Sequence, residues 1–482
     1  MEKADYSKIG LKAGLEIHQQ LDTGKLFCRC PSLLRNDQPS SIITRKLHAV
    51  AGESGEVDVA AKYESTLDKE FIYQIYDENV CLVDLDEEPP RQINQEALKI
   101  ALHISILLNC EIVPLTQIMR KTVVDGSNTG GFQRTVLIAK DGYVETSQGK
   151  VRIDSVFLEE DSARPVLKTE SQVVYRLDRL GIPLVEIATA PDIKSPEQAK
   201  ETALKIGEIL RSCKVRRGIG SIRQDLNISI KGSNRVEIKG FQDPKIMVKT
   251  VENEIKRQEN FLKNKEKNPS EVRQAISDAT TEFLRPMPGS SRMYPETDLP
   301  LLKLSREFIN ETKKTLPKSR VKIKDELKET GLNQEMIKLL LKKNKLSDFK
   351  EFVQIINKPD LVAKLLLIFP KEIASHEKLS IERINKRLSK EALAFVLENL
   401  RDNKVSESQI KDVLRRIAKG TDARDAVLFK KQDLGKIEEQ VMKLIKSKPG
   451  LSEKAYMGLV MKDFKGKISG KDIFEIIKKY VV

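Results

Sequence analysis

The sequence changes its pattern at a proline-rich segment, and this change limits what each side can fold into. Residues 284–300 contain four prolines, which lack the backbone N–H that helices and central strands need. Before this segment, strand-like and helical stretches alternate; after it, Lys-, Leu-, Ile- and Glu-rich stretches at helical spacing dominate. A chain of 482 residues also exceeds one ordinary hydrophobic core. We therefore predict an α/β (α+β) domain followed by all-α domains.

The expected elements of the first part are strands bounded by Gly, Asp and Asn, with helices between them. Asn94 is a plausible N-cap for a helix over 95–109, and Ser195-Pro196 opens a helix that reaches about Leu210. A third amphipathic helix is expected from Lys245 to about Asn264. The expected strands are 11–18, 142–146, 151–158, 184–188, 222–230 and 235–238.

We place the domain boundaries by these changes in pattern. The predicted domains are 1–303 (α/β), 304–420 (helical) and 421–482 (a small all-helical tail), with helix breaks near Pro359, Pro370 and Gly420. The proline-rich segment itself has two interpretations. It is either a linker or, because Glu296 and Asp298 are unusual in a simple spacer, a part of the first domain.

Positive charge is concentrated in the C-terminal part. Residues 301–482 hold 42 lysines and arginines against 26 acids, a net charge of +16, whereas residues 1–300 hold 43 against 45, a net charge of −2. Such asymmetry indicates a polyanion-binding appendage on a near-neutral body. The alternative is lysine-rich helix faces that only contact solvent.

The remaining composition predicts a cytoplasmic protein with reduced thiols and no membrane span. The longest apolar run, 365–369, is far too short to cross a bilayer, and the first residues lack the apolar core of a signal peptide. Cys28 and Cys30 form a Cys-x-Cys without a second cysteine pair at metal-ligand spacing, so no zinc site is expected. Cys81, Cys110 and Cys213 are interpreted as small core residues.

Two acidic clusters and one Glu-x-His pair are candidates for metal binding. Glu16 and His18 project to the same face if they lie on a strand, and a carboxylate beside an imidazole suits a divalent metal. Isolated pairs of this kind are usually only the polar face of a strand. Glu159, Glu160 and Asp161 directly follow an apolar stretch.

Glu186 is an acid between apolar neighbours, Leu184-Val185 and Ile187-Ala188. Burying such a carboxylate is costly unless it is paired or bound to a metal. A salt bridge to Arg179 is the structural alternative.

Basic groups accompany these acids. Arg120 and Lys121 precede a Gly/Ser/Asn-rich loop, 125–131, whose amides could bind phosphate oxygens, although the loop is not a Walker A sequence. Arg223 lies on an expected strand, where it alternates with Asp225, and Lys239 directly follows another expected strand and alternates with Glu237. Acidic ligands for Mg²⁺ together with scattered cations favour phosphoryl transfer from ATP.

These clusters, in this order, resemble the GatB/GatE family of tRNA-dependent amidotransferase subunits, and the likeness extends over essentially the whole chain. The segments that carry the resemblance are Gly14-Leu15-Glu16-Ile17-His18, Arg120-Lys121, Leu158-Glu159-Glu160-Asp161, Gly181-Ile182-Pro183-Leu184-Val185-Glu186-Ile187, Arg223-Gln224-Asp225-Leu226-Asn227-Ile228-Ser229 and Tyr294-Pro295-Glu296-Thr297-Asp298. Several other stretches, including Arg285-Pro286-Met287-Pro288-Gly289, are more similar to the archaeal GatE branch than to bacterial GatB.

The resemblance implies a catalytic cradle domain that phosphorylates the γ-carboxylate of Glu-tRNA(Gln) with ATP and amidates it with ammonia. By motif matching, the Mg²⁺ ligands are expected to be Glu16, His18, Glu160 and Glu186. Glu160 and Glu186 are also expected to be catalytic, as are Arg223 and Lys239. The expected ATP or acyl-phosphate contacts are Arg120, Lys121, Arg223 and Lys239. The absence of a second cysteine pair matches the zinc-free branch.

The resemblance also implies partners. Ammonia would come from an asparaginase-like GatD subunit in a heterodimer or heterotetramer, and tRNA(Gln) charged with Glu would be the substrate. The expected tRNA contacts are Lys411, Arg415, Arg416, Lys419, Lys462, Lys465 and Lys467. GatE proteins usually carry an aspartyl-tRNA-synthetase-like insertion before the Arg285 segment, and this chain has no room for one. Two alternatives therefore stay open: a non-catalytic tRNA-binding relative, and a GatB-type enzyme that also acts on Asp-tRNA(Asn).

Overall fold

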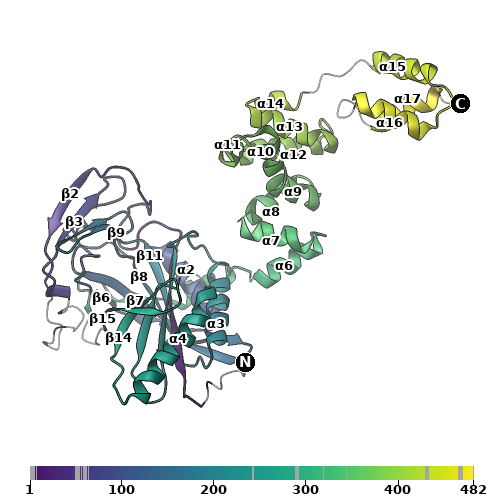
Figure 1. Ribbon diagram of the computed structural model, residues 1–482. Coiled ribbons are helices and arrows are strands. Elements are labelled where there is room, and N and C mark those ends of the chain that lie inside the picture. Colours follow the sequence, from purple (N-terminus) through teal and green to yellow (C-terminus); the bar gives the residue numbers. More distant parts are fainter. Residues whose placement is uncertain are drawn as a thin grey trace. The chain divides into compact units, whose positions relative to one another are not determined.

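The computed structural model describes residues 6–480 except 7, 49–54, 56, 58–61, 63, 242–243, 288–292, 319, 344, 429–433 and 465–469 (Figure 1). Contacts between Cα atoms divide the chain into two compact units, Met1–Arg320 and Val321–Val482. The first unit is mixed α/β and the second is helical, as the sequence predicts. The finer boundaries at 303 and 420 stay predictions. Within the described ranges, no helix is both long enough and apolar enough to cross a membrane.

One large sheet forms the body of the first unit. Its strands are β1 (Lys12–Gln20), β4 (Glu111–Ile112), β6 (Ile118–Thr122), β7 (Phe132–Thr146), β8 (Gly149–Glu160), β11 (Pro183–Thr189), β12 (Ile222–Ser229), β13 (Val236–Lys239), β14 (Glu271–Ala275), β15 (Thr281–Pro286) and β16 (Met293–Pro295). They are ordered β15-β14-β13-β12-β1-β11-β8-β7-β6-β16, and β4 pairs with β7 beside this path. The N-terminal strand β1 therefore lies inside the sheet, with a hydrogen-bonded partner on each side.

Three helices, α2 (Gln95–Leu107), α3 (Pro196–Leu210) and α4 (Pro244–Lys263), share one hydrophobic core with this sheet (Figure 1). The Asn94 side chain caps α2 by accepting N–H bonds from its first turn, and the Ser195 side chain caps α3, which opens on Pro196. These caps satisfy backbone donors that a helix start otherwise leaves unpaired. Both predicted helix starts are confirmed.

The alternation of side chains on β1 separates the two faces of the sheet. Ala13, Leu15 and Ile17 are buried in the core shared with the helices. Glu16 and His18, at the intervening positions, therefore project from the opposite face. Burial of Leu15 and Ile17 contributes about 1.5–3 kcal/mol each, and a register slip by one residue would reverse the two faces. Burial of the apolar side chains of β1 thus determines the face from which Glu16 and His18 project.

A second, four-stranded sheet lies in the same unit and holds the Gly/Ser/Asn-rich loop. Its strands, in the order β2-β3-β10-β9, are β2 (Ser41–Arg45), β3 (Glu70–Ile75), β10 (Gln172–Arg176) and β9 (Arg164–Lys168). The Tyr73 hydroxyl donates to Gly126 O over 2.8 Å, and the Tyr175 hydroxyl to Asp125 O over 2.9 Å. Gly126 has φ +83°, and a Cβ there would lie 2.1 Å from a ring carbon of Phe71, so only glycine fits.

The chain after the proline-rich segment stays with the first unit for one more helix. Strand β17 (Leu302–Lys303) pairs with β5 (Leu115–Thr116), and α5 (Arg306–Lys314) follows. His103 Nε2 of α2 lies 3.2 Å from Thr312 O of α5. The predicted boundary at 303 thus precedes a helix that packs on the first unit.

The second unit contains two separate hydrophobic clusters, one over 327–427 and one over 441–477. The helices of the first cluster are α6 (Arg320–Glu329), α7 (Gln334–Lys342), α8 (Leu346–Ile355), α9 (Pro359–Leu367), α10 (Phe369–Glu377), α11 (Ile381–Arg387), α12 (Lys390–Arg401), α13 (Glu407–Lys419) and α14 (Ala423–Ala426). Those of the second are α15 (Leu434–Ser447), α16 (Glu453–Phe464) and α17 (Gly470–Tyr480).

Candidate functional site

Antiparallel pairing brings Glu16, His18 and Glu186 to one face of the large sheet. On β1, His18 lies opposite Glu186 of β11 and opposite Arg223 of β12. Glu16 lies opposite Asp225 of β12. Residues directly opposite each other on paired strands project to the same side. This is the face turned away from α2, α3 and α4, and we call it the polar face.

Strand β8 adds Glu159 to the polar face, and not Glu160. Glu186 pairs with Phe157, so the alternation of side chains puts Glu159 on the same side and Glu160 on the other. The distance from His18 Nε2 to Glu159 Oε1 is 3.9 Å. The expectation that Glu160 lies beside His18 and Glu186 is therefore wrong. Its neighbour Glu159 lies there instead.

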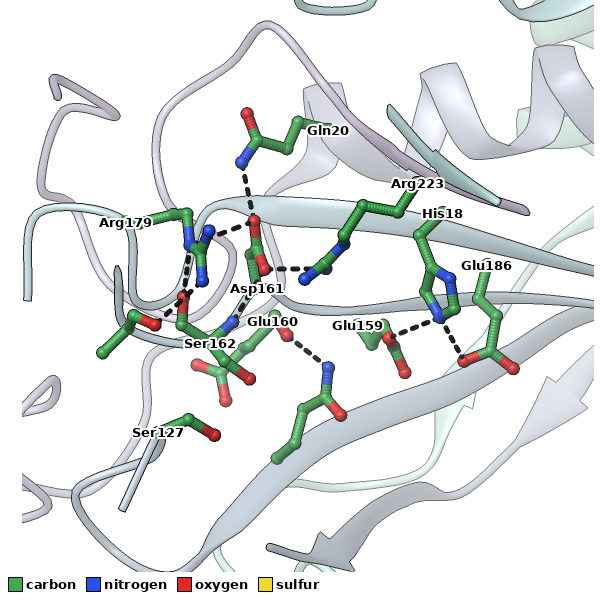
Figure 2. Close-up of polar contacts among 12 residues, drawn as sticks. His18, Gln20, Ser127, Glu159, Glu160, Asp161, Ser162, Arg179, Glu186 and Arg223 are labelled. Carbon is green, nitrogen blue, oxygen red and sulfur yellow. Dashed lines mark hydrogen bonds and ion pairs between the residues drawn. The ribbon is translucent and has the colours of Figure 1, made fainter. Parts of the chain in front are cut away.

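Short contacts connect these groups, and Figure 2 shows those of His18 with Glu159 and Glu186. His18 Nε2 lies 3.2 Å from Glu186 Oε2 and 3.4 Å from Glu16 Oε1. Lys121 Nζ donates to Glu159 Oε2 over 2.8 Å and to Glu186 Oε2 over 3.4 Å. One imidazole and one ammonium group thus offset the cost of burying the Glu186 carboxylate, which was expected to be high for an unpaired acid.

The donor set fits a divalent cation. His18, Glu159 and Glu186 each offer one ligand atom, and these atoms lie within 4.8 Å of one another; the same is true of Glu16, His18 and Asp225. Carboxylate oxygens are what Mg²⁺ binds in proteins, commonly one or two of them together with substrate phosphates. The two groups overlap at His18, so we call all five residues the His18 cluster.

The pKa values in the cluster reflect crowded negative charge. Burial raises the pKa of Glu16 to about 7, and the neighbouring charge of Glu186 adds to the effect. Burial alone would lower the pKa of His18, but the hydrogen bond and charge of Glu186, with the charge of Glu16, raise it to about 9. Burial also raises the pKa of Glu159. For Glu186 the burial effect is outweighed by Lys121 and His18, which hold its pKa well below the usual range. Carboxylates that hold a proton on an imidazole in this way also attract a dication, which would compete with that proton.

Asp161 anchors the end of β8 beside the cluster. Its carboxylate accepts from Gln20 Nε2 over 2.6 Å and from Arg223 Nη2 over 3.0 Å (Figure 2). Arg179 Nε lies 3.7 Å from Asp161 and donates to Ser162 O over 2.7 Å. The alternative prediction, a salt bridge between Arg179 and Glu186, is therefore wrong. Arg179 instead binds the loop after β8.

Two predicted cations lie on β12 and β13 at the polar face. The side chain of Arg223 is 44% exposed although it contacts Asp161, so part of its guanidinium can reach a ligand. Lys239 Nζ lies 2.5 Å from both Asp225 Oδ2 and Glu237 Oε1. Burial would lower the pKa of Lys239, but these two carboxylates raise it. Lys121, Arg223 and Lys239 thus share one face with the His18 cluster.

Arg120 is the predicted phosphate contact that does not share this face. It alternates with Lys121 on β6, and its guanidinium binds Glu296 at 2.7 Å and 2.9 Å and lies over the Phe132 ring. Arg134 Nε also donates to Glu296, over 2.8 Å. Glu296 is completely buried, so this part of the proline-rich segment belongs to the first unit and is not a simple linker.

Glu160 belongs to the same group as Arg120 and Glu296. Its Oε2 accepts the Arg134 backbone N–H over 3.3 Å and lies 3.4 Å from Arg134 Nη1. This group lies on the core side of the sheet, opposite the His18 cluster. Its contacts are those of a buried structural network.

A cavity of about 400 Å³ adjoins the His18 cluster on the polar face. Its lining includes Glu16 and, further along the same strands, Gly14, Asn227 and Ser229. Lys12 and Arg235 also line it. A pocket of this size is typical of small-ligand sites, and polar donors and acceptors surround it.

The predicted tRNA contacts on α13 face acids of α10. Lys411 Nζ lies 2.5 Å from Glu372, and Arg415 Nε and Lys419 Nζ lie 3.1 Å and 2.8 Å from Glu377. Arg416 Nη1 donates to Leu428 O over 3.4 Å. The ion pair of Lys411 with Glu372 is exposed and therefore weak, whereas Glu377 is only 13% exposed. The tRNA role of these residues stays a prediction. Lys465 and Lys467 lie outside the described residues, as does the side chain of Lys462.

The roles of Glu159 as a cluster member and of Asp161 as an anchor were not predicted from the sequence. Val156, Phe157 and Leu158 are all apolar, so this strand has no alternation of polar and apolar residues at its end. The sequence therefore does not show which face Glu159 or Glu160 projects from. The register with Glu186 supplies that information. The two-residue spacing of Glu16 and His18 was the sequence signal that put both side chains on one face.

Comparison with known proteins gives two family matches. Residues 11–310 match the GatB/GatE catalytic domain, and residues 347–481 match the family described as the GatB domain. The first match contains the His18 cluster, and the second lies in the helical part of the chain.

Among curated proteins the chain is similar to archaeal proteins named as the E subunit of glutamyl-tRNA(Gln) amidotransferase. That of Methanocaldococcus jannaschii is 36% identical, with 98% of this chain and 99% of the relative covered. Those of Archaeoglobus fulgidus and Methanosarcina barkeri are 34% and 32% identical, with 98% and 99% of both chains covered. The first alignment runs over 630 positions although this chain has 482 residues, so the relative has residues with no counterpart here. In the structure, β15 runs without a break through the point, directly before Arg285, where the insertion was expected.

Proposed function

The chain belongs to the GatB/GatE family of amidotransferase subunits, and on that premise we propose that it converts Glu-tRNA(Gln) to Gln-tRNA(Gln) with ATP and ammonia. The observation that carries this proposal is the polar face. There, the acids and the imidazole of the His18 cluster lie beside Lys121, Arg223 and Lys239.

A carboxylate needs a better leaving group before ammonia can displace an oxygen. In the proposed reaction a γ-carboxylate oxygen of the glutamyl group attacks the γ-phosphorus of ATP, the bond to the bridging oxygen breaks, and ADP leaves. Ammonia then attacks the acyl carbon, inorganic phosphate leaves with the former carboxylate oxygen, and the amide nitrogen loses a proton. Phosphoryl transfer of this kind depends mainly on positioning and on neutralising charge.

The residues of the polar face would divide these tasks. His18, Glu159 and Glu186, with Glu16 and Asp225 beside them, would hold Mg²⁺. Bound there, Mg²⁺ would neutralise phosphate charge. Lys121, between Glu159 and Glu186, would approach the transferred phosphate, and the exposed part of Arg223 would bind phosphate oxygens.

The cavity next to Glu16 fits the nucleoside part of ATP. It continues along β1 and β12 from the cluster, so a nucleotide lying there would direct its phosphates toward the cations. Asn227 and Ser229 offer amide and hydroxyl groups for the ribose or base, and Lys12 and Arg235 lie at the same cavity. Lys239 would act mainly by fixing Asp225 and Glu237.

Ammonia and tRNA require partners beyond the polar face. We assign ammonia supply to an asparaginase-like GatD subunit, because the relatives are named as one subunit of an amidotransferase. The excess positive charge of residues 301–482 supports tRNA binding by the helical part.

The experiment supplies purified chain with ammonium chloride, ATP, Mg²⁺ and Glu-tRNA(Gln), and measures Gln-tRNA and ADP. We expect both products, with ADP release stimulated by the charged tRNA. Failure to form Gln-tRNA, with tRNA binding retained, would instead identify a non-catalytic tRNA-binding relative. The same assay with Asp-tRNA(Asn) decides whether the chain also acts on that substrate. Glu186→Gln should abolish the reaction while tRNA binding is retained.

A further inference from the structure

A row of apolar side chains begins at the His18 cluster and crosses the polar face. Phe157 of β8 lies opposite Glu186, and Leu137 of β7 lies opposite Phe157. Residues directly opposite each other on paired strands project to the same side as their partners. Phe157 and Leu137 therefore share the polar face with Glu186, and the row starts directly beside the cluster.

The row continues over β6 and β16. Met119 precedes Lys121 by two residues on β6, so both side chains project from the same face. Pro295 of β16 lies opposite Met119. Met119 also lies opposite Thr135, two residues before Leu137, which makes Met119 and Leu137 diagonal neighbours within reach of each other. We call the four side chains the apolar row: Phe157, Leu137, Met119 and Pro295.

The apolar row lies outside the hydrophobic cores. Each of its four side chains is half-buried, whereas Val136 and Leu158, which alternate with them, are completely buried in the core shared with the helices. Phe157, Leu137 and Met119 pack in none of the hydrophobic clusters formed by the described residues. Half-buried apolar and aromatic side chains next to a few polar groups are typical of ligand sites.

We propose that the apolar row binds the terminal adenine base of the charged tRNA and so selects the esterified glutamyl group over free glutamate. This inference rests on the proposed function, which puts the γ-carboxylate at the His18 cluster. Free glutamate carries the same γ-carboxylate, and the ester-linked adenosine is the part that it lacks. Unpaired RNA bases are commonly bound by stacking on aromatic side chains, and a flexible methionine adapts to a planar ligand.

The position of the row fits this occupant. The strands β11, β8 and β7 are consecutive in the large sheet (Figure 1), so a spacing of about 4.8 Å per strand puts Leu137 about 10 Å from Glu186. An extended glutamyl group and its ribose together cover a comparable distance. With the γ-carboxylate at the cluster, the base would lie over Leu137, with the Phe157 ring on one side and Met119 on the other.

ATP fits the other side of the cluster better than it fits the row. The cavity of about 400 Å³ includes Lys12 and Arg235, and the exposed part of Arg223 lies on β12. A triphosphate needs such cations. The charges beside the row, those of Lys121 and Glu159, are joined to each other over 2.8 Å. The two substrates would thus approach the cluster from opposite sides, and the uncharged base would take the apolar one.

The test uses the full chain with saturating MgADP and a stable amide analogue of glutamyl-adenosine, in which an NH group replaces the ester oxygen. Calorimetry measures the dissociation constants of this analogue and of the same compound without the base. Phe157→Ala removes the ring, and Phe157→Tyr retains it. Phe283→Ala is the matched control, at a 53% exposed phenylalanine on β15. Thermal unfolding checks that each variant is folded.

We expect the wild type and Phe283→Ala to prefer the base-bearing analogue by about tenfold or more, and Phe157→Ala to bind it about 5- to 100-fold more weakly, the effect of losing one aromatic stacking partner. Phe157→Tyr should bind it nearly as well as the wild type. Affinity for the base-free compound should be the same in all four proteins, which separates loss of base binding from damage to the cluster.

Equal dissociation constants for the two compounds in the wild type, or for the analogue in the two alanine variants, would overturn the proposal. Absence of analogue binding while MgADP is bound would do so too, as would a Phe157→Ala variant whose KM is raised for ATP and not for charged tRNA. Binding is measured without the reaction. Analogue binding as expected without Gln-tRNA formation would therefore refute the proposed function alone, and Gln-tRNA formation with equal binding in both alanine variants would refute the apolar row alone.

Discussion

Exchanging Glu159 or Glu160 for glutamine should have different effects on rate and stability, because the two adjacent side chains lie in different environments. Glu159 is almost completely buried on the polar face, with Oε2 2.8 Å from Lys121 Nζ and Oε1 3.9 Å from His18 Nε2. Glu159→Gln keeps the shape and removes one charge from the proposed Mg²⁺ ligands. Loss of one preorganised group that stabilises transition-state charge costs about 10²–10³-fold in rate, or about 3–4 kcal/mol. We expect a loss of that size in Gln-tRNA formation with ammonium chloride.

Glu160→Gln is the matched control one residue away. Its carboxylate contacts Arg134, and Arg134 keeps a 2.8 Å contact with Glu296 when the charge of Glu160 is removed. Weakening this buried pair should cost about 1–3 kcal/mol of folding stability. The rate at saturating substrates should stay within about tenfold of the wild type, or about 1.4 kcal/mol. Initial rates and thermal unfolding are measured for both variants. A larger rate loss in Glu160→Gln than in Glu159→Gln would refute the assignment of faces.

Three further changes test neighbouring parts of the account. Lys121→Met should lower the ATP-dependent rate about 10²-fold, with tRNA affinity in filter binding unchanged; unchanged rate would remove Lys121 from the phosphate site. Arg120→Lys breaks the two-pronged contact with Glu296 and should lower the free energy of unfolding by about 1–3 kcal/mol, with a smaller effect on rate than Lys121→Met. Removal of residues 421–482 should weaken tRNA binding and flatten its salt dependence, while a collapse of activity at saturating tRNA would place these residues in the catalytic body.

The sequence was sufficient for the fold class and for most of the elements around the site. The caps at Asn94 and Ser195 are local signals, because a short polar side chain bonds to the backbone of the next turn, and both helices start where expected. Glu16 and His18 were correctly placed on one face because residues two apart on a strand project to the same side. Such short-range patterns determine direction within one element.

Long-range pairing was not available from the sequence, and the errors came from there. Whether Glu159 or Glu160 faces His18 depends on the register of β8 with β11, which joins residues far apart in the chain. The partner of Arg179 was wrong for the same reason. Cys81, which was interpreted as a small core residue, is only partly buried and lies beside Cys28, Cys30 and Asp84.

If the polar face transfers the γ-phosphate of ATP to the glutamyl carboxylate, one carboxylate oxygen must leave with the phosphate. Isotope labelling of the carboxylate detects this oxygen. Glu-tRNA(Gln) labelled with ¹⁸O in the γ-carboxylate is incubated with the chain, ATP, Mg²⁺ and ammonium chloride, and the released phosphate is analysed by mass spectrometry. We expect one ¹⁸O atom in each phosphate released per Gln-tRNA formed, and no labelled phosphate with Glu186→Gln. Gln-tRNA formation with unlabelled phosphate would contradict it.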